Sequence, residues 1–228
     1  MIGIIGGTGL TKIADLKVLE SRWVDTPYGE ASAALTFGKI NENKVVFLAR
    51  HGDPHQIPPH KINYRANISA LKQAGVSQII AVNAVGGMHS ALGPAKIAIP
   101  DQIIDYTYGR EHTLYDASSS HLDHIDFTEP YSQNMRQLLL AAAKKAGVNV
   151  WDGGTYAATQ GPRLETAAEI AKYQRDGCDL VGMTGMPEAS LARELEIDYA
   201  CLALSVNWAA GLSETSITMD DIHQAIDQ

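Results

Sequence analysis

Cysteine is scarce in this sequence, and the scarcity limits how the chain can be stabilised. Only Cys178 and Cys201 occur among 228 residues, which excludes a disulfide framework as the basis of the fold and favours a reducing compartment. A chain of this length can bury enough apolar surface to fold without disulfides or metal ions. We therefore expect one domain, residues 1–228, stabilised by its hydrophobic core.

Positive charge and long apolar runs are also lacking. The formal net charge is −8, which disfavours a nucleic-acid partner because binding to phosphate backbones needs a basic field. No uncharged run approaches the roughly 20 residues that cross a bilayer. The apolar start MIGIIGGTGL has neither the basic flank nor the cleavage pattern of a signal peptide. We expect a cytoplasmic protein with no membrane or nucleic-acid partner.

What the sequence does contain is an alternation of short β-branched runs with segments of helical periodicity. This alternation favours an α/β fold, with a mixed and largely parallel central sheet flanked by helices. We expect strands over residues 2–5, 44–49, 78–83, 95–104, 179–182 and 199–206, and helices over 63–74, 130–146, 164–175 and 187–195. Residues 108–128 are rich in His, Asp and Ser and are predicted to form a long loop, the kind of segment that often serves as a lid or a subunit contact.

Glycines and polar side chains follow several of these strands, at the edge where α/β sheets bind ligands. The turn Gly6-Gly7-Thr8-Gly9 can direct backbone N–H groups and the Thr8 hydroxyl at an oxyanion. Arg50 can grip a phosphate in bidentate fashion, with His51 as a neighbouring donor. A ligand-free glycine turn and a surface arginine remain the alternatives.

Two other ligand classes fit these motifs less well. The glycines do not have the G-x-G-x-x-G spacing of dinucleotide-binding folds. His51, His55 and His60 suggest a metal site, but the intervening prolines prevent a helix from presenting them on one face. We expect no metal and no cofactor.

Thr184, Glu165 and Asn207 complete the candidate site. Thr184 follows one strand and precedes a helix, where its hydroxyl can face an anion or cap the helix. A carboxylate and an amide together could bind a 6-oxopurine as it leaves a sugar, because that base carries an N1–H donor, an O6 acceptor and an N7 that gains proton character. Glu165 can accept from N1–H, while an amide at Asn207 can accept at N7–H and donate to O6. An exposed helix carboxylate and a strand-end cap are the alternatives for these two residues.

Longer motifs give these residues a family likeness. In order and spacing, the sequence resembles the trimeric purine nucleoside phosphorylase and methylthioadenosine phosphorylase family over nearly its whole length. The motifs that carry the resemblance are GIIGGTGL, RHG, NYRANISALK, VNAVGG, IPDQIIDYT, TQGPRLET and GMTGMPEASLARELEIDYACLALSVNW.

The resemblance implies a phosphorylase fold, a homotrimer with active sites near subunit boundaries, and small-molecule substrates, namely a nucleoside and inorganic phosphate. It implies that phosphate is held at the positions of Thr8, Arg50, His51, Ala84 and Thr184. Met183 resembles the residue that packs under the ribose. Asn207 and Glu165 would act on the base, and Trp208 and Ala209 follow them at the end of the last strand as further substrate-binding candidates.

Departures from the methylthioadenosine enzymes bear on the substrate. Those enzymes carry Asp at the base-reading strand end and Thr at the position of Asn83, so Asn207 and Asn83 make this chain resemble the 6-oxopurine phosphorylases. Met219 aligns with an apolar position that reads the 5′ end of the sugar, where a thioether suits a methylthio group, although His223 lies one helical turn further. We expect phosphorolysis of 5′-methylthioinosine. The alternatives are an inosine or guanosine phosphorylase, a methylthioadenosine phosphorylase, and a nucleoside-binding regulator without turnover.

Overall fold

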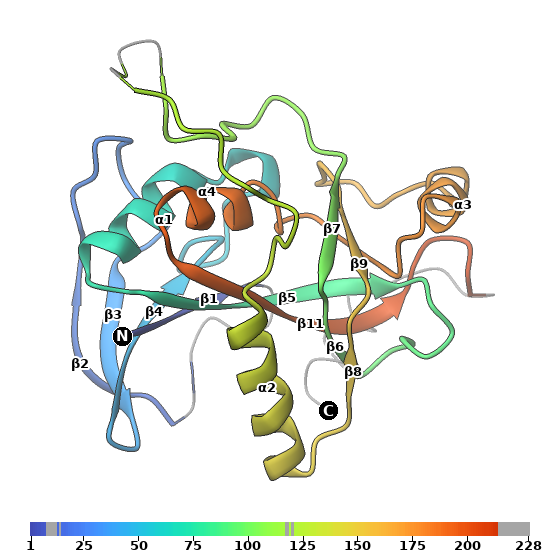
Figure 1. The fold of residues 1–228 in the computed structure, drawn as a ribbon, viewed down its shortest axis with the longest axis horizontal. Coiled ribbons are helices and arrows are strands. Elements are labelled where there is room, and N and C mark those ends of the chain that lie inside the picture. The colour runs from blue at the N-terminus through green and yellow to red at the C-terminus, as the bar shows by residue number, and fades with distance from the viewer. Residues whose placement is uncertain (8–12, 14, 117–118, 120, 214–228) are drawn as a thin grey trace.

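The computed structural model describes residues 1–7, 13, 15–116, 119 and 121–213. Its strands join in one mixed sheet, with α1 and α4 on one side and α2 on the other (Figure 1). No helix in this part of the chain is long and apolar enough to cross a membrane. The strands are β1 (Ile2–Gly6), β2 (Lys17–Arg22), β3 (Leu35–Ile40), β4 (Asn43–Ala49), β5 (Gln78–Gly87), β6 (Lys96–Ile99), β7 (Gln102–Asp105), β8 (Val150–Asp152), β9 (Thr155–Ala158), β10 (Leu180–Gly182) and β11 (Asp198–Trp208). The helices are the 3-10 helix η1 (Pro59–Lys61), α1 (Tyr64–Gln73), α2 (Gln133–Ala146), α3 (Ala167–Arg175) and α4 (Glu188–Glu194).

Strand β5 lies at the centre of the sheet. Strand β1 pairs in parallel with both β4 and β5, and β11 pairs in parallel with β5. The carboxyl ends of these four strands therefore meet at one edge. Strand β10 runs antiparallel to the end of β5, with Leu180 opposite Gly87 and Val181 opposite Gly86. This pairing brings the residues after β10 back alongside β5.

Three of the helices, α1, α2 and α3, begin where the sequence supplies a side-chain cap. The side chain of Asn63 accepts from the N–H of Ala66 at the start of α1, and Ser132 does the same for Met135 in α2. Thr166 and Glu169 form a reciprocal capping box at the start of α3. Each cap satisfies N–H groups that a helix leaves unpaired. All four predicted helices are confirmed, with bounds shifted by no more than a turn at either end.

The strand expected over residues 95–104 is wrong as a single element. It is divided into β6 and β7, which pair with different neighbours: β6 with β8 and β11, and β7 with β9. Pro100 lies between them, and proline has no N–H to donate to a ladder. The other expected strands are confirmed. The loop prediction is also confirmed for the described residues between 106 and 128, which form no helix or strand.

Candidate active site

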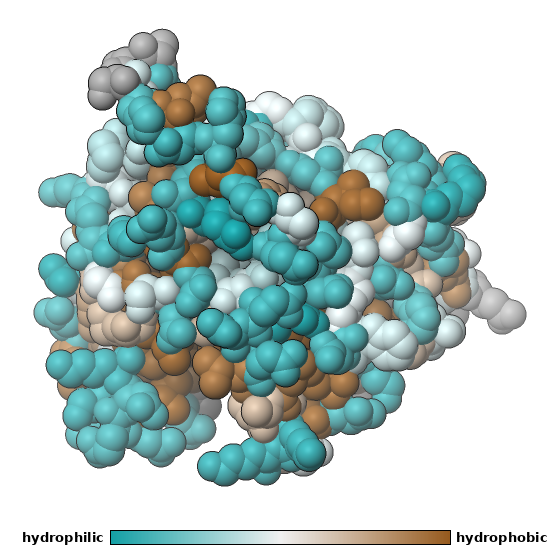
Figure 2. Space-filling view, in the orientation of Figure 1, coloured by the Kyte–Doolittle hydropathy of each residue, from teal (hydrophilic) through white to brown (hydrophobic). Residues whose placement is uncertain are grey.

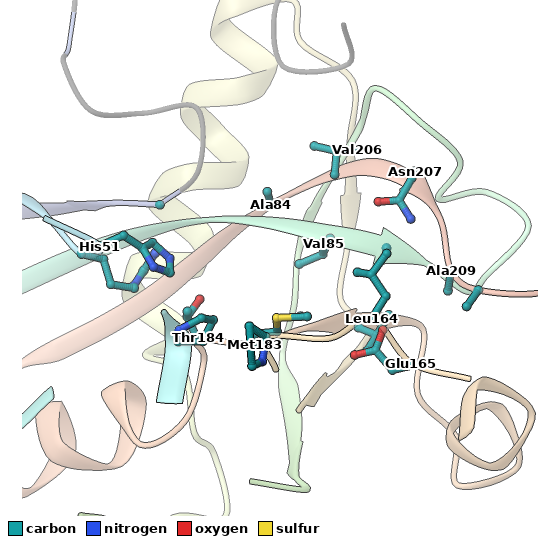
Figure 3. Close-up of a pocket in the computed structure, with 18 residues that line it drawn as sticks. His51, Ala84, Val85, Leu164, Glu165, Met183, Thr184, Val206, Asn207 and Ala209 are labelled. Atoms are coloured by element: carbon teal, nitrogen blue, oxygen red, sulfur yellow. The ribbon is translucent and has the colours of Figure 1, made fainter. Parts of the chain in front are cut away.

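A cavity of about 250 Å³ opens at the edge where the strand ends meet (Figure 3). The turn after β1 contributes Gly7, the end of β4 contributes the neighbouring Arg50 and His51, and the remaining walls come from β5, β10, β11 and the segment before α3. The predicted site residues that line the cavity are Arg50, His51, Ala84, Glu165, Met183, Thr184, Asn207 and Ala209.

The lining residues fall into two groups along the cavity. His51 and Thr184 lie at one end, Asn207 and Glu165 lie at the other, and Met183 lies between them (Figure 3). The first group offers a hydroxyl and an imidazole, to which the neighbouring Arg50 adds a cation, and the second pairs an amide with a carboxylate. We call the end with His51 and Thr184 the anion end and the end with Asn207 and Glu165 the base end, because an amide and a carboxylate can pair with the edge of a heterocyclic base. The apolar thioether of Met183 lies between the two ends.

Arg50 is held at the anion end by a buried carboxylate. Its Nε and Nη2 donate to the two oxygens of Glu188 at 2.7 and 2.8 Å, and both side chains have no solvent exposure. Tyr199 donates its hydroxyl to the same carboxylate at 2.8 Å. Burial alone lowers the pKa of Arg50, but the paired Glu188 outweighs it and raises that pKa above its ordinary value. The guanidinium is therefore a fixed positive charge.

The remaining donor of Arg50 is directed at the glycine turn. Nη1 donates to the carbonyl of Val82 at 3.1 Å, and Nη2 also donates to Oδ1 of Asn83 at 3.5 Å. A guanidinium has five N–H groups, so these four contacts leave one N–H, on Nη1. A Cβ at Gly7 would lie 2.8 Å from Nη1. Only glycine at position 7 permits this close approach, which leaves the N–H at the cavity wall.

His51 differs from the sequence-based expectation that it is a donor. Its Nδ1 lies 2.8 Å from the carbonyl oxygen of Ile57, and because a carbonyl can only accept, Nδ1 carries the proton. The pKa of His51 is lowered to about 4, chiefly by burial, and the neighbouring Arg50 contributes in the same direction. The ring is neutral near pH 7, so Nε2 is an acceptor. An acceptor of this kind suits a protonated phosphate oxygen.

Asn83 on β5 orients Thr184, which follows the neighbouring strand β10. The Nδ2 of Asn83 donates to the Thr184 hydroxyl oxygen at 2.8 Å, and Asn83 is 1% exposed. Because that oxygen accepts a hydrogen bond, its own O–H is left to donate into the cavity. The helix-cap alternative for Thr184 does not apply, since Pro187 is the N-cap of α4.

Glu165 at the opposite end is held by a hydroxyl. Thr159 donates to Oε1 of Glu165 at 2.7 Å, and Glu165 precedes α3 rather than standing on its exposed face. The second carboxylate oxygen remains an acceptor for a ligand donor.

Asn207 reaches the cavity through an irregularity in β11. The pairing with β5 shifts register between Ser205 and Asn207, so Val206 is an extra residue in the ladder. Adjacent strand residues normally face opposite sides of a sheet, yet Val206 and Asn207 both line the cavity. The bulge re-aims Asn207. Its Nδ2 donates to the carbonyl of Trp208 at 2.6 Å, which leaves Oδ1 and one N–H of the amide.

One described candidate residue is not brought into the cavity, and the structure does not describe two others. Trp208 is absent from its lining, and its indole packs so closely on Gly93 that a Cβ there would lie 2.7 Å from the ring. Thr8 and Met219 lie outside the described residues, as does His223. Among the described residues no cluster of three or more His, Cys, Asp or Glu could hold a metal ion.

Sequence analysis missed the residues that support the site. Glu188, Tyr199 and Thr159 touch the candidate residues rather than the cavity itself. Glu188 gave no usable signal, because an acidic residue in the first turn of a helix is ordinary and does not indicate a buried cation.

Comparison with known proteins gives a consistent result. The family model described as "Phosphorylase superfamily" matches residues 1–228. The chain is 56% identical to the probable S-methyl-5'-thioinosine phosphorylase of Pseudomonas syringae pv. tomato, over 98% of this chain and 91% of that protein. It is 48% identical to the 6-oxopurine nucleoside phosphorylase of Pyrococcus furiosus, over 97% of this chain and 84% of that protein. Its structure resembles methylthioadenosine phosphorylase from Schistosoma mansoni in complex with adenine, with a TM-score of 0.94 and 33% identity, over 99% of this chain and 85% of that chain.

Proposed function

The chain belongs to the phosphorylase superfamily, and from this premise we propose that it catalyses phosphorolysis of 5′-methylthioinosine to hypoxanthine and 5-methylthioribose 1-phosphate in purine salvage. It is an enzyme of the pentosyltransferase type. The observation that carries the proposal is the pairing of Asn207 and Glu165 at one end of a cavity whose other end holds His51 and Thr184.

Phosphate is proposed to bind at the anion end. The remaining Nη1–H of Arg50, the Thr184 hydroxyl and the N–H of Ala84 donate to it, Nε2 of His51 accepts from a protonated phosphate oxygen, and Thr8 supplies a further hydroxyl. Together these groups hold one phosphate oxygen toward C1′ of the sugar. The positive charge of Arg50, held in place by Glu188, stabilises the bound phosphate without reorganising during the reaction.

The base leaves at the other end. As the phosphate oxygen forms a bond to C1′, the C1′–N9 bond breaks and its electron pair passes to the purine. N7 takes up a proton from solvent water, and Oδ1 of Asn207 accepts from the resulting N7–H. The amide N–H donates to O6, and the free oxygen of Glu165 accepts from N1–H. Met183 packs against the sugar between the two ends. The rate enhancement comes from positioning and electrostatics, with no covalent enzyme intermediate, cofactor or metal.

A second candidate is an inosine or guanosine phosphorylase, which the Pyrococcus relative favours. Methylthioinosine and inosine share the same base and differ only at the 5′ end of the sugar. The greater identity to relatives named for methylthioinosine supports the first candidate. Comparing kcat/KM for phosphate-dependent release of base from methylthioinosine, inosine and methylthioadenosine separates them. No release from any of the three would refute the enzyme proposal and favour a binding protein.

Asn207→Asp tests the base assignment. A carboxylate cannot donate to O6 but can accept from a 6-amino group, so the ratio of kcat/KM for methylthioinosine over methylthioadenosine is expected to fall by about 100-fold or more. Asn134→Asp, in the exposed first turn of α2, makes the same charge change away from the cavity and should leave the ratio unchanged. An unchanged ratio in Asn207→Asp would show that this residue does not read the base.

We also infer a homotrimer in the cytoplasm. The family resemblance supports the trimer, and so does apolar surface: Figure 2 shows apolar side chains gathered around α2, where Leu138 is 58% exposed. The two free, buried cysteines suit a reducing compartment. Light scattering on the purified protein measures the oligomer directly, and a monomeric mass would contradict the inference.

A further inference from the structure

Arg110 is a cation in the long loop after β7 whose guanidinium is directed at backbone. Its Nη2 donates to the carbonyls of Thr159 and Gln160 at 3.1 and 2.8 Å, and Nη1 donates to those of Met183 and Met186 at 2.9 and 2.6 Å. Nε donates to the side-chain oxygen of Gln160 at 3.1 Å. Among the described residues no carboxylate lies within ion-pair distance of Arg110. Carbonyl oxygens thus provide the partners that a carboxylate usually supplies.

The two backbone segments that Arg110 joins lead to opposite ends of the cavity. Thr159 follows β9 and donates its hydroxyl to Glu165 at the base end. Met183 and Thr184 follow β10 and form the middle and the anion end. Strands β9 and β10 are parallel neighbours, so their carboxyl-terminal turns lie side by side. A backbone bond from the N–H of Thr159 to the carbonyl of Gly182, at 2.8 Å, joins the two strands at their ends. Beyond that bond, Arg110 connects the two turns through carbonyls on both sides.

Tyr64 at the start of α1 makes the connection rigid. Its hydroxyl accepts from Nη1 of Arg110 at 3.1 Å and itself donates to the carbonyl of Pro59, which lines the cavity. The guanidinium also lies over the Tyr64 ring, 5.4 Å from its centroid. A planar guanidinium can bind several carbonyls in fixed directions, whereas a lysine ammonium is a point charge with three donors.

We propose that Arg110 is a positioning residue that sets the separation between the phosphate-binding and base-binding ends of the active site. This inference rests on the proposed phosphorolysis. The attacking phosphate oxygen, C1′ and the departing N9 must align, and a displacement of about 1 Å far from the chemistry can reduce a rate by about 100-fold. By tying the Thr159 turn to the Met183 turn, Arg110 keeps Glu165 and Thr184 at the spacing of one nucleoside plus one phosphate.

The test compares Arg110→Lys and Arg110→Ala with wild type in kcat, in KM for both substrates and in thermal stability. We expect kcat at saturating methylthioinosine and phosphate to fall by about 30-fold or more in both variants, because Lys keeps the charge but cannot bridge two turns. Millimolar methylguanidine should restore part of kcat to Arg110→Ala and none to Arg110→Lys. A purely stabilising role would lower the melting temperature without this recovery.

Arg193 provides the matched control. It too donates to loop carbonyls, those of Asp126 and Glu129, but the segments that it joins do not line the cavity, whereas Met183, a partner of Arg110, does. Arg193→Lys and Arg193→Ala should change stability while kcat stays within about twofold of wild type, since no reacting group depends on Arg193.

Three outcomes would overturn the positioning role. The first is a folded Arg110→Ala that keeps kcat within about threefold of wild type. The second is a loss of kcat in Arg110→Ala that methylguanidine does not restore. The third is failure of both Arg110 variants to fold, which would give Arg110 a role in folding alone. Failure of the proposed function is seen separately, as absence of turnover in wild type. If wild type shows no turnover, calorimetric titration measures the affinity of the Arg110 variants for hypoxanthine instead. An affinity equal to that of wild type would again refute the positioning role.

Discussion

Removal of the Glu188 charge is expected to destabilise the protein strongly. Glu188→Gln keeps the shape of the side chain but leaves the Arg50 guanidinium buried without a countercharge, since both side chains are fully inaccessible to solvent. Breaking one partner of a buried ion pair costs about 3–5 kcal/mol. For a chain of this size each kcal/mol corresponds to roughly 2–4 °C, so we expect the melting temperature to fall by about 6–20 °C.

Phosphate makes the same experiment specific to the active site. In Glu188→Gln a bound phosphate dianion becomes the nearest countercharge for Arg50, so added phosphate should raise the melting temperature of the variant by more than that of wild type. Scanning calorimetry with and without phosphate measures both effects. Glu194→Gln is the control, because Glu194 lies on the same helix and, in the part of the chain that the structure describes, accepts only from the backbone N–H of Leu114. A fall of less than about 3 °C in Glu188→Gln would refute the claim that the pair is a buried, mutually dependent unit.

Two further predictions concern the anion end. Asn83→Ala removes the donor that orients the Thr184 hydroxyl, so KM for phosphate should rise by about 3- to 10-fold, the value of one hydrogen bond, in steady-state assays; an unchanged KM would contradict the orienting role. For His51 the pKa in the folded protein, about 4, lies below the ordinary 6.5, so between these pH values the unfolded chain binds a proton that the folded protein does not. The neutral ring therefore contributes fully to stability above pH 6.5. This contribution declines by up to about 3 kcal/mol as the pH falls, and it is lost as the pH passes through 4. Urea denaturation across this range should show a steeper decline for wild type than for His51→Asn, and parallel curves would show that the ring is not held neutral.

The sequence predicts the anion end of the cavity well because that end depends on parallel strands. Arg50, Ala84 and Thr184 each follow or end a β-branched run, and the carboxyl ends of such strands converge in any α/β sheet. Trp208 was expected in the site only because it follows Asn207. Its ring lies against Gly93 instead, as the alternation of strand faces would place it.

The supporting residues could not be found from local patterns. Glu188 and Arg50 are 138 residues apart in the chain, and neither belongs to a spacing that marks an ion pair. Arg110 lies in a segment with no periodicity, and its partners are backbone carbonyls, which are the same whatever the residue. Contacts of this kind depend on tertiary structure and leave no signature in residue type.

The bulge at Val206 also bears on how such an enzyme changes its substrate over evolution. Because the extra residue fixes the direction of position 207, the side chain there can be exchanged without altering any ladder partner of β5 or β11. Codons for Asn and Asp differ by a single nucleotide, so one nucleotide substitution exchanges the amide for the carboxylate and leaves the backbone conformation unchanged. Loss of the bulge would need a deletion and would turn position 207 to the other face of the sheet. Under the proposed role of Asn207, base preference is thus open to point mutation, while the backbone that presents residue 207 is protected from it.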